Sequence, residues 1–230
     1  MSQKMVRAER ADGIKSRRNI LNAAASLATT EGLDGLSIGS LAEHIGMSKS
    51  GLYAHFGSKE ELQLATIETA GAIFVAVIIE PTLLIDDPLE RIRALCSRFL
   101  DHVERRVFPG GCFFASVSAE FATRPGPVRA RVAEFQKGWM AMLTELIAKA
   151  QALGSIDARE DPPQLAFEIN SYLLMANLAF VLHNEDFALE RARTAVRFRL
   201  DCARATPRSL HRARSVRAGG NGEKLRAPSA

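Results

Sequence analysis

The stretch Ile38-Gly-Ser-Leu-Ala-Glu-His-Ile-Gly-Met-Ser-Lys-Ser-Gly-Leu-Tyr-Ala-His-Phe56 predicts two short helices joined by a tight turn. Ala42 is small enough to lie where two helices cross. Gly46, four residues later, tolerates the left-handed backbone that ends one helix and turns the chain. The stretch therefore predicts a helix-turn-helix with helices over about 38–45 and 49–56.

Caps and apolar spacing support the same arrangement. Ser37 and Ser48 precede the two helices and are well placed as N-caps. An apolar set at helical spacing is expected to hold the pair together: Leu41, Ile45, Met47, Leu52 and Phe56. With the last two facing inward, the helical period leaves the other side chains of the second helix wholly or partly outward.

A polar, outward-facing second helix of this kind is typical of a recognition helix in the major groove of DNA. Lys49 and Ser50, in its first turn, are expected to reach base edges, and Gly51 lets the helix approach closely. Phosphate contacts are expected from other side chains and from the N–H groups at the start of the next helix. The complete expected DNA-binding set is Ser37, Ser48, Lys49, Ser50, Gly51, Tyr53, His55 and Lys59.

The alternative is a pair of packed helices in an ordinary helical domain, because an Ala-x3-Gly pattern often occurs by chance. Here the pattern coincides with caps, apolar spacing and an exposed polar second helix, which favours DNA binding.

The rest of the chain also predicts helices, because apolar residues recur at three- and four-residue steps without sustained alternation. The fold class is therefore all-α. The sequence Ser58-Lys-Glu-Glu61 begins the fourth helix as a capping box, and most prolines fall at predicted boundaries. The remaining helices are expected at about 13–30, 59–79, 88–107, 113–123, 127–153, 163–183 and 187–203.

Composition indicates a folded protein of two domains. The 230 residues are 47% hydrophobic and 24% charged, which is ordinary for a soluble globular chain. No uninterrupted apolar run approaches the ~18 residues of a membrane span, and the N-terminus has no signal-peptide core. We therefore expect a cytoplasmic protein without a membrane partner. The three cysteines form no CxxC pair, which argues against a disulfide framework or a zinc site.

The net charge of +4 and the pI near 9.2 describe mainly the C-terminus. Residues 204–230 carry seven Lys and Arg against one acidic residue, whereas residues 1–60 carry eight against six. The pI is therefore weak support for DNA binding. The expected organisation is a flexible basic arm (1–12), a helix-turn-helix domain (13–60), a larger helical domain (61–204) and a disordered basic tail (205–230).

The segment from about Arg17 to Ile67 resembles the DNA-binding domain of the TetR family of transcriptional regulators. The matching features are Ile20-Leu-x-Ala-Ala24, Gly32-Leu-Asp-Gly-Leu-Ser-Ile38, Leu41-Ala42, the run from Gly46 to Phe56, and Ser58-Lys-Glu-Glu-Leu62. The resemblance implies an N-terminal three-helix DNA-binding head and a larger helical body that binds an effector and dimerises. It further implies that the protein represses transcription by binding a double-stranded, palindromic operator. A small-molecule effector, whose identity the sequence does not reveal, would relieve this repression.

The last two predicted helices are the expected dimer interface. The segment from Leu165 to Leu182 is apolar nearly all round, which indicates a helix buried on several sides. By resemblance, helices 163–183 and 187–203 form a four-helix bundle with their twofold mates in a homodimer. Two recognition helices on two half-sites would then combine individually weak contacts.

A ligand pocket is expected among the middle helices. The candidate lining residues are Phe99, Cys112, Phe113, Phe114, Trp139, Tyr172, Met175 and Asn177. Aromatic and methionine residues at helical spacing are more often ordinary core, and that alternative stays open for each of them. Cys112, near a helix N-terminus, is either an oxidant sensor with a lowered pKa or, as we favour, a buried and inert thiol.

An all-helical enzyme is the main alternative class. The sequence contains no nucleophile elbow, phosphate loop, HExxH motif or suitably spaced carboxylate pair, so no catalytic residue, metal or cofactor is expected. A second alternative is an architectural protein that binds DNA through the basic tail. In that case deletion of residues 205–230 would abolish DNA binding and Tyr53→Ala would not.

Overall fold

The computed structural model describes residues 3–185 and 187–205, with side chains described from Ser16 onward. Over these residues the fold is all-α, as predicted, and the one pairing of extended backbone is an isolated bridge between Ile156 and Arg204. The head consists of α1 (Gln3–Glu31), α2 (Ile38–His44) and α3 (Lys49–Tyr53). The body contains α4 (Lys59–Phe74), α5 (Pro88–Glu104), α6 (Phe113–Phe121), α7 (Pro127–Ala152), α8 (Pro162–His183) and α9 (Phe187–Cys202).

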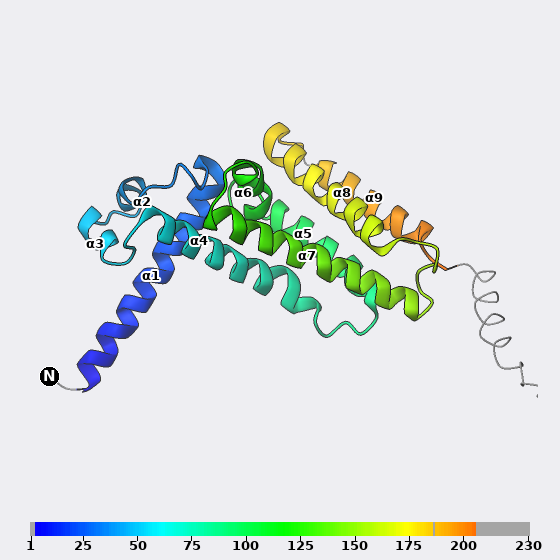
Figure 1. Ribbon diagram of the computed structural model, residues 1–230, viewed down its shortest axis with the longest axis horizontal. Coiled ribbons are helices and arrows are strands. Elements are labelled where there is room, and N and C mark those ends of the chain that lie inside the picture. Colours follow the sequence, from blue (N-terminus) through cyan, green and yellow to red (C-terminus); the bar gives the residue numbers. More distant parts are fainter. Residues whose placement is uncertain (1–2, 186, 206–230) are drawn as a thin grey trace, which may run out of the picture.

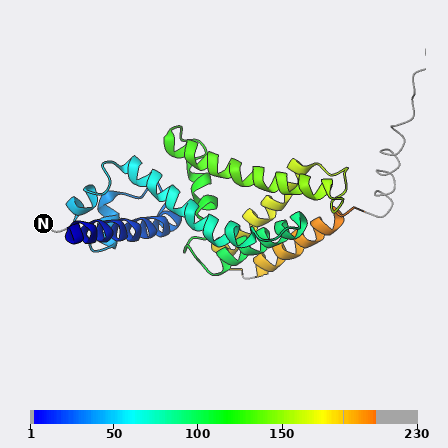
Figure 2. The same ribbon diagram turned by 90° about the horizontal axis from the view of Figure 1, so that it is seen from below.

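The molecule is elongated, with α2 and α3 near one end and the C-terminal end of α9 near the other (Figure 1). Helices α8 and α9 lie side by side along one edge of the body, as both ribbon views show (Figures 1 and 2). Helix α1 packs against α4 and α6, so the head and the body share a continuous hydrophobic core. A shift of α4 or α6 in the body therefore acts directly on the head.

Helix α1 starts about ten residues earlier than the sequence predicts. Residues 3–12, expected to be a flexible arm, are part of the helix. They contain good helix formers and no glycine or proline, and the single Gly13 that follows is tolerated inside a helix. The predicted basic tail, by contrast, lies outside the described residues from position 206 onward.

The connection from head to body changes helix type. Sequence periodicity predicts one α-helix over 59–79, but the α-helical part, α4, ends at Phe74. A π-helix, Val75–Ile79, and a 3-10 turn, Glu80–Thr82, follow it directly. Such π-helical segments are rare and frequently mark functional positions.

Prolines open three of the body helices, as predicted. Pro88, Pro127 and Pro162 each occupy the first turn, where the missing N–H costs little. Asp87 caps α5 by accepting hydrogen bonds from the backbone N–H groups of Leu89 and Glu90, at 2.8 and 3.0 Å. The helix boundaries in the body are therefore set by local chemistry.

Two segments, Lys59–Thr82 and Pro162–His183, are long and apolar enough by composition to cross a membrane, although neither contains an uninterrupted apolar run of that length. Both are core helices of this fold. The first packs on α1 and α7, and α8 packs on α5, α7 and α9. Within the described body 44% of the first segment and 39% of the second are buried, so packing in one chain accounts for only part of their apolar character.

Candidate nucleic-acid interface and ligand cavity

Side-chain caps fix α2 and α3 as predicted. The Ser37 hydroxyl accepts a hydrogen bond from the Ser40 backbone N–H at 3.0 Å, and the Ser48 hydroxyl accepts one from Gly51 at 3.1 Å. Gly46 has a φ of 68°, the left-handed conformation expected of the turn between the helices. The two serines and the glycine therefore define the helix-turn-helix locally.

The predicted inward and outward faces of α3 are confirmed. Leu52 and Phe56 are fully buried, whereas Lys49, Ser50 and Tyr53 are exposed. Tyr53 is 57% exposed despite its large ring, so the ring is presented to solvent and to an approaching partner. Gly51 and His55 are half-buried, and α3 ends at Tyr53 instead of 56, so His55 lies just after the helix.

Arg17, which the sequence does not mark as a site residue, holds the end of this unit in place. Its guanidinium lies 4.4 Å from the centre of the Phe56 ring and donates a hydrogen bond to the His55 carbonyl at 2.6 Å. The cation over the aromatic face and the hydrogen bond together attach α1 to the residues that follow α3. Arg17 lies at the start of the matching segment, but nothing in its local sequence indicates these two long-range contacts.

The start of α4 combines a cap with an ion pair. Ser58 accepts a hydrogen bond from the Glu61 backbone N–H at 3.1 Å, while the Glu61 carboxylate accepts one from Gly57 at 3.0 Å. Lys59, a predicted phosphate contact, lies 3.2 Å from the Asp34 carboxylate. Asp34 also pairs with Arg124, and these two cations hold the pKa of its carboxyl below the usual range. Lys59 would therefore exchange one anionic partner for another on contacting a phosphate.

Glu120 of α6 connects the body to the same region of the head. Its carboxylate accepts hydrogen bonds from the backbone N–H groups of Leu33 and Asp34, at 2.8 and 2.7 Å. These charge-assisted bonds are short, and they bind the loop after α1 to the body. The position of α6 is thus transmitted to the loop that carries Asp34.

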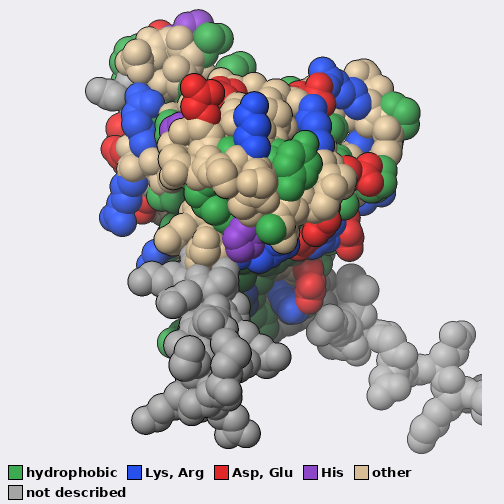
Figure 3. Space-filling view, turned by 90° about the vertical axis from the view of Figure 1, so that its left-hand side faces the viewer, with side chains coloured by type: hydrophobic (Ala, Val, Ile, Leu, Met, Phe, Trp, Pro, Cys, Tyr) green, Lys and Arg blue, Asp and Glu red, His purple; other side chains and the backbone are tan. Residues whose placement is uncertain are grey.

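Figure 3 faces the head end of the molecule. On the part of this end that is not drawn in grey, Lys and Arg side chains are interspersed with acidic ones. This distribution agrees with the small excess of positive charge counted over residues 1–60. The exposed face of α3 and its caps, more than a strong electrostatic field, are what this surface offers to a partner.

A small cavity lies between the middle helices of the body. Its volume is about 10 Å³, room for about one water molecule. Four of the predicted pocket residues line it: Phe99, Cys112, Phe114 and Trp139. The other lining residues are not predicted from the sequence; they are Phe74, Ala115, Phe135, Gln136, Asn170 and Leu174.

The other four predicted pocket residues lie elsewhere. Phe113 is buried in the surrounding core, and Asn177 accepts a hydrogen bond from the Cys112 backbone N–H at 2.8 Å. Tyr172 and Met175 instead line a surface groove between α8 and α9, so the prediction that they share a pocket with Trp139 is wrong. Both residues lie on α8, as predicted, but on a different side of this helix from the cavity.

The Cys112 thiol is buried, and burial raises its pKa to about 11. An oxidant sensor needs a lowered pKa and solvent access, so the structure favours the inert thiol. No cluster of candidate metal ligands occurs within the described part of the chain.

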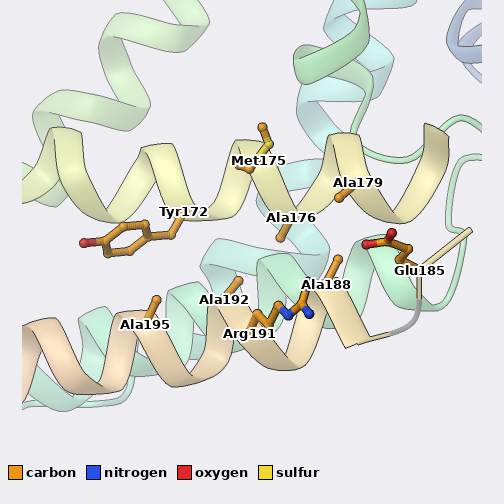
Figure 4. A pocket seen from close by; sticks show the side chains of 9 residues that line it. All are labelled: Tyr172, Met175, Ala176, Ala179, Glu185, Ala188, Arg191, Ala192 and Ala195. Atoms are coloured by element: carbon orange, nitrogen blue, oxygen red, sulfur yellow. The ribbon is translucent and has the colours of Figure 1, made fainter. Parts of the chain in front are cut away.

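The groove between α8 and α9 has a volume of about 230 Å³. Figure 4 shows Tyr172 and Met175 on α8 and the small side chains of Ala188, Ala192 and Ala195 on α9. Large apolar side chains are exposed on the same two helices: Phe167, Met175, Leu178, Leu182, Phe187 and Phe198. An exposed apolar surface of this kind marks an interaction site.

Comparisons with known proteins match both parts of the chain. A family model described as "Bacterial regulatory proteins, tetR family" matches residues 20–66, and one described as "Tetracyclin repressor-like, C-terminal domain" matches residues 88–196. The transcriptional regulator AcuR of Cereibacter sphaeroides is 24% identical over 157 residues, covering 67% of this chain and 71% of AcuR.

Solved structures agree with these matches. A TetR transcriptional regulator from Chloroflexus aurantiacus has a TM-score of 0.72 and 25% identity, over 81% of this chain and 94% of its own. AibR, solved in complex with isovaleryl coenzyme A and operator DNA, has a TM-score of 0.63 and 26% identity, over 77% of this chain and 94% of its own.

Proposed function

Because the chain belongs to the TetR family of transcriptional regulators, with a helix-turn-helix DNA-binding domain and a ligand-binding C-terminal domain, we propose that it is a cytoplasmic, dimeric repressor. The dimer binds a palindromic operator and is released by a small molecule. The domain limits that we propose are 13–60 for DNA binding and 61–204 for effector binding and dimerisation. Regulation requires neither a catalytic residue nor a cofactor.

The observation that carries this proposal is the exposed α3 on a rigid, capped support. Lys49 and Ser50 project from its first turn and are assigned to base edges, and Gly51 permits close approach. Phosphate contacts are assigned to Tyr53, to Lys59 and to the free N–H groups at the start of α4. His55 and the Ser37 and Ser48 hydroxyls complete the set, with both hydroxyls already serving as caps.

The dimer is proposed to form through α8 and α9. Leu178 and Leu182 on α8 are 50% and 67% exposed, and Phe198 on α9 is 70% exposed. A twofold axis would place this surface against its own copy, so that large side chains of one subunit enter the alanine-lined groove of the other. Such a face also explains why so apolar a helix as α8 is not fully covered within one chain.

Control by a ligand is proposed to act on α4 and α6, which connect the body to the head. A ligand shifts the affinity for DNA only by binding one conformation better than the other, with coupling of typically ~1–3 kcal/mol. The AibR complex, which contains both a small molecule and operator DNA, supports the pairing of these two partners in this family.

The test is binding of the purified chain to a fluorescent duplex of its own upstream region, followed by anisotropy at several salt concentrations. We expect saturable binding and weakening by Tyr53→Ala on every sequence, because Tyr53 is assigned to the backbone. Substitution of Lys49 should instead change the preferred sequence. If deletion of residues 205–230 abolished DNA binding and Tyr53→Ala left it unchanged, DNA binding would be assigned to the tail. Absence of any binding would return the question to the enzyme class.

A further inference from the structure

The ring of Phe74 is the centre of the aromatic cluster beside the cavity. It meets five other rings at centroid distances between 5.3 and 6.5 Å and at steep interplanar angles: Phe99, His102, Phe114, Phe135 and Trp139. These neighbours come from α5, α6 and α7, whereas Phe74 is the last residue of α4. One side chain of α4 thus fills an aromatic slot formed by three other helices.

His102 is the unsatisfied polar group of this cluster. It is 2% exposed, and neither ring nitrogen has a hydrogen-bond partner among the described residues. A neutral imidazole has one donor and one acceptor, and leaving both buried without partners costs free energy. His102 lies one turn after Phe99 on the same face of α5, and its ring packs against Phe74 and Phe108.

The cavity walls determine what else can enter. No charged side chain is among the residues that line the cavity, and its polar groups are the amides of Gln136 and Asn170 and the indole N–H of Trp139. That N–H already donates to Asn170 at 3.0 Å. With room for only about one water, a larger molecule enters only when a ring moves.

We propose that the effector is a small, uncharged aromatic molecule with one hydrogen-bonding group, and that it takes the place of the Phe74 ring with its polar group on His102. This inference rests on the proposed ligand-controlled function. An aromatic ring reproduces the edge-to-face contacts that Phe74 gives up. A single hydroxyl or similar group satisfies His102, and a charged molecule would lose its hydration without an opposite charge in the cavity walls.

This mode of binding also supplies the coupling to DNA. Displacement of Phe74 moves the end of α4, whose other end carries Lys59 at the DNA-binding surface. Gly71, one turn before Phe74, lies so close to Phe135 that an added Cβ would be 3.2 Å from that ring. A movement of α4 toward α7 would therefore press on the ring of Phe135, which lines the cavity.

Trp139 provides a direct readout, since it is the single tryptophan of the chain and lines the cavity. The full-length protein is titrated with benzyl alcohol, toluene, cyclohexylmethanol and benzoate, and tryptophan emission is followed. We expect benzyl alcohol to bind about tenfold more tightly than toluene, which lacks the hydroxyl. Benzyl alcohol should also bind at least tenfold more tightly than cyclohexylmethanol and benzoate.

Two variants separate the parts of the proposal. His102→Leu removes the unsatisfied imidazole, so the protein stays folded, but the advantage of benzyl alcohol over toluene should disappear. Phe74→Ala opens the slot and should bind benzyl alcohol at least tenfold more tightly while losing operator affinity without any ligand. Phe180→Ala removes a buried ring outside the cluster and is the matched control, with binding of benzyl alcohol unchanged.

The proposal is overturned if benzoate or cyclohexylmethanol binds as well as benzyl alcohol, if His102→Leu keeps the preference for the hydroxyl, or if no probe alters Trp139 emission. Anisotropy on operator DNA without probes is measured in parallel. Retained DNA binding with failure of the probes rejects the aromatic effector alone, whereas loss of DNA binding rejects the proposed function itself.

Discussion

The proposed DNA-binding surface and the aromatic cavity are built in opposite ways. The surface is exposed, and its parts lie within about twenty residues of one another from Ser37 to Lys59. The cavity is narrow and only partly open to solvent, and its walls come from five helices between Phe74 and Leu174. The first site depends on local caps and turns, the second on how distant helices pack.

This difference determines how each site responds to a substitution. Substitution of an exposed α3 side chain such as Lys49 or Tyr53 is expected to change a proposed contact with DNA and to disturb the packing of the head little. A substitution in the cavity changes packing density first, since buried rings fill space for their neighbours. The two sites should therefore respond differently to the same kind of mutation, and the following experiments test that expectation.

The largest effect is expected for Leu178→Glu in the proposed dimer interface. Each twofold interface would bury two unpaired carboxylates, at roughly several kcal/mol each, so the dimer should dissociate. Operator affinity should collapse with it, whereas the Trp139 emission spectrum should remain as in the wild type. Sedimentation velocity and anisotropy measure the two outcomes.

Leu84→Glu is the control for this substitution. Leu84 is 94% exposed and lies in the connection before α5, outside α8 and α9 in the chain, so a charge there should leave the dimer intact. Tight operator binding by monomeric Leu178→Glu would show that the head acts independently of the body.

Next in size is Phe56→Ala. Phe56 is fully buried beneath Arg17, and truncation of such a ring costs about 3–5 kcal/mol. The head should lose the support of α3 and with it operator binding, while the environment of Trp139 in the body stays unchanged. Urea unfolding followed by circular dichroism and by tryptophan emission would show two separate transitions. A single coincident transition in the variant would mean that head and body unfold as one unit.

A smaller effect of pH is expected from His102. Burial lowers the pKa of this imidazole from 6.5 to about 4, so the unfolded chain takes up a proton that the folded protein does not. The contribution of His102 to the free energy of unfolding is therefore fully present above pH 6.5. It decreases as the pH falls from 6.5 to about 4, by up to about 3 kcal/mol. Urea denaturation at neutral pH and near pH 5 measures the loss. His102→Leu should remove that part of the pH dependence, and an unaltered dependence would contradict the assignment.

The smallest effects concern Lys59 and its partner Asp34. Lys59→Ala should weaken binding to all duplexes alike and reduce the salt slope by about one. Asp34→Asn releases Lys59 from an exposed ion pair worth ~0.2–1 kcal/mol, so operator affinity should rise by at most about fivefold. Anisotropy across a salt series measures both. Equal affinity of the Asp34→Asn variant and the wild type would mean that the ion pair does not compete with DNA.

The sequence predicted the head well because its signals are local. Ser37, Gly46 and Ser48 specify caps and a turn through contacts within a few residues, and the period of α3 determines its exposed side. What local signals could not reveal are the long-range supports. Arg17 on Phe56 and Glu120 on the loop after α1 join residues 39 and about 87 positions apart, which no spacing pattern encodes.

In the body, helix existence was predictable and cavity membership was not. The prolines marked where α5, α7 and α8 begin, but Tyr172 and Asn170 are only two residues apart on α8, and they lie on different surfaces. Which side of α8 faces inward depends on α5, α7 and α9 together. Phe74 was missed because an apolar residue near the end of a long helix looks like any other core residue until its five ring neighbours are known.

The π-helix at Val75–Ile79 has a consequence for register. A π-helical turn contains about one residue more than an α-helical turn, and one residue corresponds to about 100° of rotation along an α-helix. Conversion of this segment to regular α-helix would therefore turn Phe74 relative to Ile78 without any change in chain length. The protein thus holds a one-residue offset next to the ring that fills the aromatic slot. Deletion of a single residue in Val75–Ile79 would show whether the function of the protein depends on a change of rotation between α4 and the residues that follow it.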